Sequence, residues 1–354
     1  RVVEICLLSK AKNHYNKTLF PWICTGEINS TPTKHQKIHN RMLDSRHRQQ
    51  TLVGLAFVSP WLIGLAVLFV YPFAASWYWS FCRFDLLNEP QFIGLDHYQR
   101  LAGEIIRGDR FGQALWNTAY YALLSVPLSI VVAIGLAVML SWKVRGQAFF
   151  RTLFFLPSVV PLVAAAILWM WLLDPRDGPV NQLLELVGWP AQLWFQGSQE
   201  AANPGSFLQF GSKDALVLMS IWGVGNFMII YLAALADVPQ SLHEASALDG
   251  AGSLRRFWHI TLPMLTPIIF FNLILGLIQS VQAFTRVYLV SEGTGEPVGS
   301  TLLLSLHLFL AAFQDLEMGY ASAMAWILFV VLALATYFLF RSSRYWVHYQ
   351  EKLR

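Results

Sequence analysis

Long apolar stretches alternate with short polar segments along most of the chain. Six of these stretches contain no Asp, Glu, Lys, Arg or His, and each is at least 22 residues long. A helix needs about 20 predominantly apolar residues to cross the hydrocarbon core of a bilayer, so each stretch predicts one membrane-spanning helix. The six predicted spans comprise residues 51–81, 111–142, 152–173, 215–236, 263–285 and 318–340.

One further apolar run, at residues 300–313, is too short to cross a bilayer. It contains His307, and the polar residues Gln314 and Asp315 follow it. It lies between the fifth and the sixth predicted spans. We therefore expect an interfacial or surface helix on the outer side of the membrane.

The composition supports the same class of protein. Of the 354 residues, 55% are hydrophobic and only 13% are charged, and the mean hydropathy is +0.46. A soluble globular domain carries about 25% charged residues, so an ordinary soluble enzyme is disfavoured. Intrinsic disorder needs low hydrophobicity and is disfavoured as well. The sequence predicts an all-α polytopic membrane protein.

The distribution of Lys and Arg predicts how the spans are oriented. With six spans both termini lie on one side, and the segments on that side carry 18 Lys and Arg against 7 on the other. Without residues 1–41 the bias is still 11 against 7. Because basic segments remain in the cytoplasm, we expect both termini to be cytoplasmic, in a bacterial cytoplasmic (inner) membrane.

The same pattern divides the chain into four parts. They are a polar leader (1–50), the first span with its outer loop (51–110), the main membrane domain (111–340) and a cytoplasmic tail (341–354). Residues 1–41 contain no long apolar run, so they are not a secretory signal peptide. Since Met42 precedes a short basic stretch and the first span, we expect residues 1–41 to be an over-extended start or a disordered tail.

Several kinds of active site are missing from the sequence. The six spans contain no ionisable residue of the kind that a proton relay requires, which disfavours a proton-coupled carrier. No GxxxxGK[ST] phosphate-binding loop, HExxH or GxSxG motif occurs, and the three cysteines are far apart. We therefore expect no catalytic residue and no metal site. Uphill transport would have to draw its energy from another protein.

The predicted cytoplasmic loop between the fourth and fifth spans, residues 240–263, contains two short helical segments. Ser241 and Glu244 have the spacing of a capping box, in which each side chain satisfies a free backbone amide at a helix start. Gly250 suits a left-handed helix end, and Ser253 is placed to cap a second helix that runs towards Pro263. We call residues 240–263 the elbow. The apolar face of the elbow comprises Leu242, Ala245, Leu248, Leu254, Phe257 and Trp258. Because this face lies beyond the lipid, we expect a protein surface to cover it.

The elbow resembles the EAA motif of ABC-importer permeases, which ends in I-x-L-P. Matching positions are Glu244, Ala245, Ser246, Asp249, Gly250, Ala251, Ile260, Leu262 and Pro263. Ser246 stands where the motif usually has alanine, and the Asp-Gly-Ala triplet at 249–251 is the form typical of sugar permeases. The resemblance extends over about residues 50–340, and segments 59–72, 92–98, 149–157, 169–175 and 319–323 also match.

This resemblance implies the six-helix fold of type-I ABC importer permeases of the maltose, lactose and glycerol-phosphate type. It implies a permease subunit that forms, with a second homologous permease, the path for a carbohydrate delivered by an extracytoplasmic binding protein. Two ATP-binding-cassette ATPases would dock on the elbows and use the ATP, so this chain would be no enzyme and bind no cofactor. The alternative from another class is a self-sufficient secondary carrier or channel for small polar solutes.

Polar side chains within the spans are the candidates for the substrate path. Asn272, Gln279 and Gln282 fall on one narrow arc of the fifth predicted span, with Gly276 close to it. Asn226 lies in the fourth span, one turn beyond Trp222. Like the three residues of the arc, it carries an amide that is costly to bury in hydrocarbon without a hydrogen-bond partner. Either the amides bond across helices and hold the bundle together, or Trp222, Asn226, Asn272, Gln279 and Gln282 line a sugar cavity. The sequence does not identify the sugar.

Overall fold

The computed structural model describes residues 34–142, 145–196, 211–296 and 299–348, with only the backbone described for 34–49 and 196. Contacts divide the chain into two compact units, Arg1–Pro72 and Phe73–Arg354, which we describe separately. The first unit contains helix α2 (Lys34–Leu65), the π-helical turn η1 (Ala66–Val70) and the first two residues of α3 (Tyr71–Trp79). Residues 1–33 of the expected leader lie outside the described residues, whereas α2 begins at Lys34.

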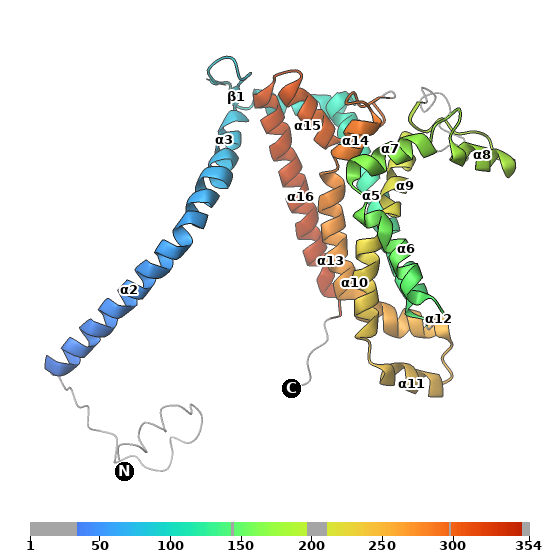
Figure 1. Cartoon of the computed structure of the whole chain (residues 1–354). Helices are drawn as coiled ribbons and strands as arrows, with labels where there is room; N and C mark the ends of the chain where they lie inside the picture. The colour runs from blue at the N-terminus through green and yellow to red at the C-terminus, as the bar shows by residue number, and fades with distance from the viewer. Residues whose placement is uncertain (1–33, 143–144, 197–210, 297–298, 349–354) are drawn as a thin grey trace, which may run out of the picture. The chain divides into compact units, whose positions relative to one another are not determined.

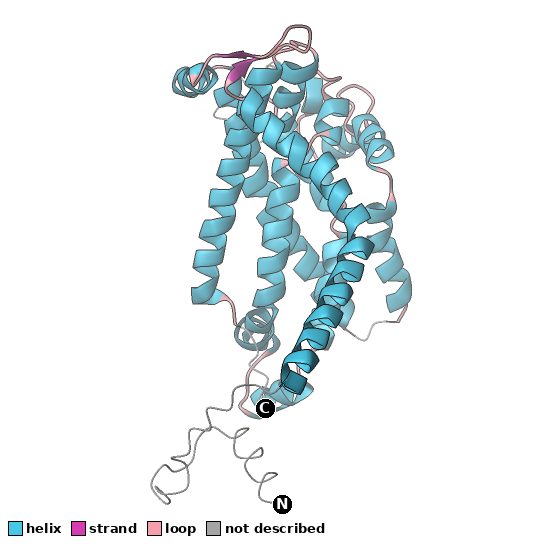
Figure 2. Ribbon diagram, turned by 90° about the vertical axis from the view of Figure 1, so that its left-hand side faces the viewer, coloured by secondary structure: helices cyan, strands magenta, loops and turns pink. Residues whose placement is uncertain are grey.

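The second unit is built almost entirely of helices, and a short two-stranded hairpin lies near one end of them (Figure 2). The antiparallel strands β1 (Cys82–Arg83) and β2 (Gln91–Phe92) pair Cys82 with Phe92. The helices that follow are α4 (Asp96–Arg107), α5 (Arg110–Ser141), α6 (Gln147–Val159), α7 (Leu162–Leu172), α8 (Pro179–Leu186), η2 (Trp194–Gln196), α9 (Ser212–Trp222), α10 (Gly225–Ala236), α11 (Gln240–Leu248), α12 (Ser253–Arg256), η4 (Phe257–Thr261), α13 (Leu262–Val281), α14 (Thr285–Val290), α15 (Leu304–Phe313) and α16 (Met318–Trp346).

Helix α5 is the central helix of this unit and packs against α4, α6, α9, α10, α13 and α15. One of its faces carries a small residue every four positions, namely Ser125, Ser129, Ala133 and Ala137, and all four are buried. Small side chains at this spacing allow neighbouring backbones to approach closely, which is how membrane helices gain packing contacts without a hydrophobic driving force. The sequence of α5 therefore favours a position surrounded by other helices.

Two of the predicted spans are broken. Residues 152–173 form α6 and α7, which meet at an angle of 99°, and residues 215–236 form α9 and α10, which meet at 47°. At the first break Pro161 forces the preceding Val160 into an extended conformation. Four other helical segments are long and apolar enough to cross a membrane: Gln50–Trp79, Arg110–Ser141, Ser253–Val290 and Met318–Trp346. The described residues thus contain four candidate spans, or up to six if each bent pair is one span.

The expectation of a surface helix at 300–313 is wrong. Helix α15 is buried along most of its length, with Leu304, Leu306 and His307 among its buried residues, and it packs on α5 and α16. Its sequence LSLHLFLAAF is apolar on every side, and a helix that is apolar all round is typically buried rather than interfacial.

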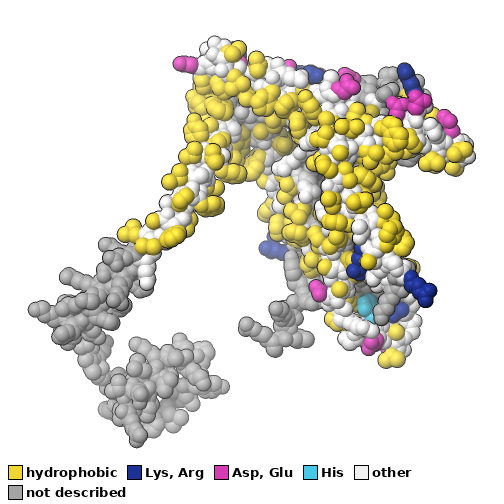
Figure 3. Space-filling view, viewed as in Figure 1, with side chains coloured by type: hydrophobic (Ala, Val, Ile, Leu, Met, Phe, Trp, Pro, Cys, Tyr) yellow, Lys and Arg dark blue, Asp and Glu magenta, His cyan; other side chains and the backbone are white. Residues whose placement is uncertain are grey.

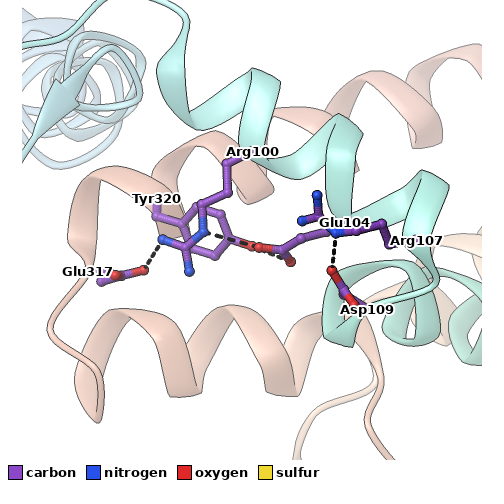
Figure 4. Close-up of polar contacts among 6 residues, drawn as sticks. All are labelled: Arg100, Glu104, Arg107, Asp109, Glu317 and Tyr320. Atoms are coloured by element: carbon purple, nitrogen blue, oxygen red, sulfur yellow. Dashed lines mark hydrogen bonds and ion pairs between the residues drawn. The ribbon is translucent and has the colours of Figure 1, made fainter.

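Ion pairs fasten α4 to the start of α16 (Figure 4). The Arg100 guanidinium lies 3.1 Å from a carboxylate oxygen of Glu104 and 2.8 Å from one of Glu317. It also lies over the Tyr320 ring, 4.1 Å from the ring centre, while the Tyr320 hydroxyl donates a hydrogen bond of 2.8 Å to Glu104. Burial opposes the charge on Arg100, but the carboxylates of Glu317 and Glu104 raise its pKa above the ordinary value. This network fixes the end of the bundle where α4 and α15 lie.

The surface of the second unit is largely apolar between its two ends. In Figure 3 hydrophobic side chains cover the sides of the helices, whereas charged side chains gather near α4 and α8 at one end and near α11 and α12 at the other. Large apolar side chains such as Leu123, Val131 and Phe338 are more than 60% exposed. An exposed apolar band of this kind suits lipid rather than water.

Candidate functional site

The elbow projects from one end of the second unit, at the opposite end from α14 and α15 (Figure 1). Its first helix, α11, begins after Pro239, whose backbone is extended, and no side chain caps the helix. The expected capping box of Ser241 and Glu244 is therefore wrong, because Ser241 is already the second residue of the helix. Glu244 lies in mid-helix and is exposed.

Gly250 ends α11 as the sequence predicts. Its φ is +76°, in the left-handed region that favours glycine. The amide of Ala251 donates a hydrogen bond of 3.0 Å to the carbonyl of Ser246, and the amide of Gly250 donates one of 3.1 Å to Ala247. These two bonds are the pair that defines a Schellman helix end, and they turn the chain from α11 towards α12.

The second half of the elbow is continuous with the fifth span. Gly252, not Ser253, precedes the first helical residue of α12, so the expected Ser253 cap is wrong. Helix α12 passes through the π-helical turn η4 into α13 without a break. Pro263 removes one amide from this continuous helix, and the π-helical turn η4 directly precedes α13 at that point.

The residues that match the EAA motif separate into two groups. Glu244, Ala245, Asp249 and Gly250 are exposed, whereas Ser246, Ala251, Ile260, Leu262 and Pro263 are half-buried. Of the predicted apolar face, Leu248 is 91% exposed, Leu254 72% and Trp258 56%. Phe257 instead packs against the bundle. Apolar side chains exposed to this extent on the projecting elbow form a surface suited to a protein partner.

A cavity of about 410 Å³ lies among α5, α9, α10, α13 and α14. Its volume is within the range of small-molecule sites, about 300–1,000 Å³. Asn272, Gln279 and Gln282 all line it, so the structure brings these three predicted residues together. The wall is otherwise rich in hydroxyl groups, contributed by Tyr121, Ser125, Ser129, Ser220, Ser280 and Thr285.

Asn272 has no exposed surface, and neither end of its amide has a hydrogen-bond partner among the described residues. The Tyr231 hydroxyl on α10 is also buried and has no hydrogen-bond partner among the described residues. A buried amide without a hydrogen-bond partner lowers stability by roughly several kcal/mol. Asn272 therefore has free hydrogen-bonding capacity at the wall of the cavity.

The other two predicted path residues do not line this cavity. Trp222 is half-buried and packs edge-on against Trp169, with their ring centres 6.0 Å apart. Asn226 is exposed on α10. Gly276 does line the cavity, and it allows α13 to approach α5 closely, since a Cβ at this position would lie 3.0 Å from Val126.

Sequence reasoning missed several lining residues. Ser125 and Ser129 lie one turn apart on α5, and this hydroxyl spacing inside an apolar stretch was the available signal. Arg286 also lines the cavity, from α14. In the sequence Arg286 directly follows the uncharged stretch 263–285, so the pattern gives it no place within a predicted span.

Together, the apolar helices, the polar cavity and the projecting elbow define a multi-pass membrane transport subunit. Residues 108–346 match the family described as binding-protein-dependent transport system inner membrane component, and the chain belongs to this family. It is 44% identical over 308 residues to the probable ABC transporter permease protein YesP of Bacillus subtilis, with 86% of this chain and 94% of that protein covered. It is 33% identical to the lactose transport system permease protein LacF of Rhizobium radiobacter, with 85% and 97% covered.

A solved structure has the same fold. It is the crystal structure of a bacterial ABC transporter involved in the import of the acidic polysaccharide alginate. The TM-score is 0.69 at 22% sequence identity, and the match covers 86% of this chain and 98% of that chain.

These findings confirm that the chain is a permease subunit of an ABC importer, a transport component rather than an enzyme. The alternative of a self-sufficient carrier or channel is set aside, since members of this family work as components of a binding-protein-dependent system.

Proposed function

We propose that this permease forms, with a second homologous permease, the transmembrane path for a carbohydrate delivered by an extracytoplasmic binding protein. Two ATP-binding-cassette ATPases bind the elbows and use the ATP, and this chain holds no cofactor of its own. The chain crosses a bacterial inner membrane six times, with each bent helix pair counted as one span and with both termini in the cytoplasm.

One observation carries the proposal: the helix that forms half of the elbow is the same helix that lines the cavity. From Ser253 to Val281 the chain is helical through α12, η4 and α13. Asn272 and Gln279 lie on this helix, four to seven turns from the elbow's exposed Leu254 and Trp258. A displacement of the elbow is therefore transmitted mechanically to the cavity wall. This arrangement suits alternating access driven by a docked partner.

The lining of the cavity supports a carbohydrate. Sugar hydroxyls both donate and accept hydrogen bonds, as do the amides and hydroxyls of the wall. The lactose permease relative and the alginate importer carry carbohydrates by name. We assign Asn272, Gln279 and Gln282 to the path. Trp222 and Asn226, which lie off this cavity, have no assigned contact.

The orientation follows from charge and from the elbow. Segments expected on the elbow's side of the membrane carry most of the Lys and Arg residues of the chain. An ATP-using partner is cytoplasmic, so the elbow must face the cytoplasm. The start of α16, which the network of Arg100, Glu104 and Glu317 fastens to α4, lies at the end of the bundle opposite the elbow (Figure 1), and we infer that this end is the outer one.

The test is affinity purification of the tagged chain from cells that express the whole transport system, followed by uptake in proteoliposomes. Both ATPases and a second permease should co-purify, and uptake of a radiolabelled sugar should require ATP and the binding protein. Leu248→Asp should abolish ATPase co-purification, because Leu248 is 91% exposed and supports no packing within the chain.

Leu186→Asp is the matched control, since Leu186 is 83% exposed on α8, away from the elbow. It should co-purify the ATPases normally. Uptake that persists without ATP, or ATPase binding that survives Leu248→Asp, would contradict the proposal.

A further inference from the structure

The cavity is electrostatically asymmetric. Among the described residues that line it, Arg286 carries the one formal charge, and none of them is acidic. The next acidic residues along the chain, Glu292 and Glu296, line a different cavity. Arg286 is therefore the one charged side chain in a described wall of amides, hydroxyls and apolar side chains.

Arg286 has no ion pair and no hydrogen bond to any of the residues that the structure describes. Two arginines at the outer end of the bundle differ in this respect. Arg100 pairs with Glu104 and Glu317, and Arg107 pairs with Asp109 (Figure 4). Arg286 is also half-buried. A partly buried cation without a partner is costly in a membrane protein, and such residues usually mark a substrate or ion path.

The guanidinium of Arg286 lies at a helix break, where the carbonyl end of α9 and the amide end of α10 meet. A Cβ at Gly223 would lie 3.9 Å from a guanidinium nitrogen of Arg286, so the guanidinium lies beside the break between α9 and α10. Helix α10 begins just after this break, and its preceding residues Gly223 and Val224 line the cavity. The first amides of a helix have no partner within it and carry partial positive charge. In transporters the starts of broken helices stabilise anionic substrate groups.

An independent feature of the same cavity points to a ligand. Asn272 is completely buried, and both polar ends of its amide lack a partner among the described residues. A ligand with hydroxyl groups would satisfy them. The cavity thus combines a site for one negative charge with a wall for neutral hydrogen bonds.

We propose that the cavity selects a polyhydroxylated ligand that carries an anionic group, with Arg286 binding the anion and Asn272 a hydroxyl. A guanidinium can bind a carboxylate, phosphate or sulfonate through two parallel hydrogen bonds. This inference rests on the proposed function and narrows its substrate class from carbohydrates in general to acidic ones.

The experiment measures ATP-dependent uptake by the complete transporter in proteoliposomes. The probes are matched disaccharides that differ only in whether C6 of one sugar carries a hydroxymethyl or a carboxylate group, together with the corresponding C6 phosphate. Since binding proteins impose their own preference, stimulation of ATP hydrolysis by each probe is also measured without the binding protein, at high probe concentration.

Wild-type transporter should prefer an anionic probe to its neutral partner. Arg286→Gln should reduce the ratio of anionic to neutral uptake at least about tenfold, the order expected when a charge-assisted hydrogen bond is lost. Arg286→Lys should retain part of the preference, because the charge remains while the two-pronged geometry is lost. Arg83→Gln, at an exposed position outside the cavity, is the matched control and should behave as wild type.

An equal preference in Arg286→Gln and wild type would overturn the inference. Transport of neutral probes alone by the wild type would also overturn it, yet would leave the proposed function standing. Failure to take up any sugar probe would contradict both. If Arg286→Gln does not assemble, the comparison of Arg286→Lys with wild type decides, since a purely structural role would leave the ratio of anionic to neutral uptake unchanged.

Discussion

The end of α11 offers a sharp test of how the elbow holds its shape. Gly250→Ser places a side chain at a φ of +76°, where an L-residue costs about 1–2 kcal/mol relative to glycine. A Cβ at Gly250 would meet no atom within 4 Å, so the cost is entirely in the backbone and includes no collision. The helix has nine residues, too few for stability on its own. Its Schellman bonds therefore matter to the shape of the elbow.

A cost of 1–2 kcal/mol lowers the ratio of native to distorted elbow by a factor of about 5–30. We expect Gly250→Ser to weaken ATPase binding by up to this factor and to reduce uptake, with a normal amount of protein in the membrane. Gly250→Asn should be milder, since asparagine tolerates the left-handed region better than other residues. Co-purification at limiting ATPase concentration and ATP-dependent uptake measure the effect.

Gly252 provides the control. It also has open space around its Cα, but its φ is −67° and its ψ 164°, which is the backbone of a helix N-cap. Serine is favoured there, so Gly252→Ser should retain or slightly improve ATPase binding. If Gly250→Ser and Gly252→Ser behave alike, the backbone argument is refuted.

Three further predictions address the elbow, a buried histidine and the cavity. Glu244→Lys should weaken ATPase binding without changing the thermal stability of the solubilised chain, because Glu244 is exposed and caps nothing; a large drop in melting temperature would show that Glu244 has a structural role. Burial lowers the pKa of His307 below 6.5, and neither ring nitrogen has a partner among the described residues. His307→Leu should therefore raise stability by about 1–2 kcal/mol. As the pH falls below about 6.5, protonation of His307 opposes folding of the wild type. The stability gain of His307→Leu over the wild type should therefore increase from pH 7.5 to pH 5.5, as measured by thermal melts, and a gain that shrinks would contradict this reasoning. A cysteine at Gln279 should react with small polar thiol reagents in at least one state of the assembled transporter, and complete protection in every state would remove Gln279 from the path.

Several features of this protein follow from the sequence alone. The lengths of the uncharged stretches predict where membrane helices lie, because backbone amides in hydrocarbon must be satisfied within the helix. The glycine at position 250 predicts a left-handed backbone there, because few other residues adopt a positive φ at low energetic cost. The narrow arc of Asn272, Gln279 and Gln282 follows from the helical period, and the three residues do share one cavity.

Other features depend on contacts that no local pattern contains. The extended backbone of Pro239 starts α11 at Gln240, and this displaces Ser241 from the capping position that its spacing suggests. Asn226 is exposed and Trp222 packs on Trp169, because the cavity is lined by another face of these helices, which carries Ser220, Gly223, Val224 and Phe227. Which face of a helix meets the cavity depends on contacts with other helices.

The positions of α15 and Arg286 also depend on contacts between distant residues, which the local sequence pattern does not contain. Hydrophobicity indicates how much apolar surface of a segment must leave water, but not whether lipid or protein covers that surface. The sequence therefore predicts an interfacial helix at α15, whereas the structure buries it. Arg286 follows an apolar stretch directly, and only the packing of α14 against α7, with the guanidinium near Gly223, places it on the cavity wall. The sequence by itself determines which segments leave water, because burying polar groups is costly and only the uncharged apolar stretches avoid that cost. The tertiary structure decides which polar groups then meet, because that depends on bends and contacts between distant residues.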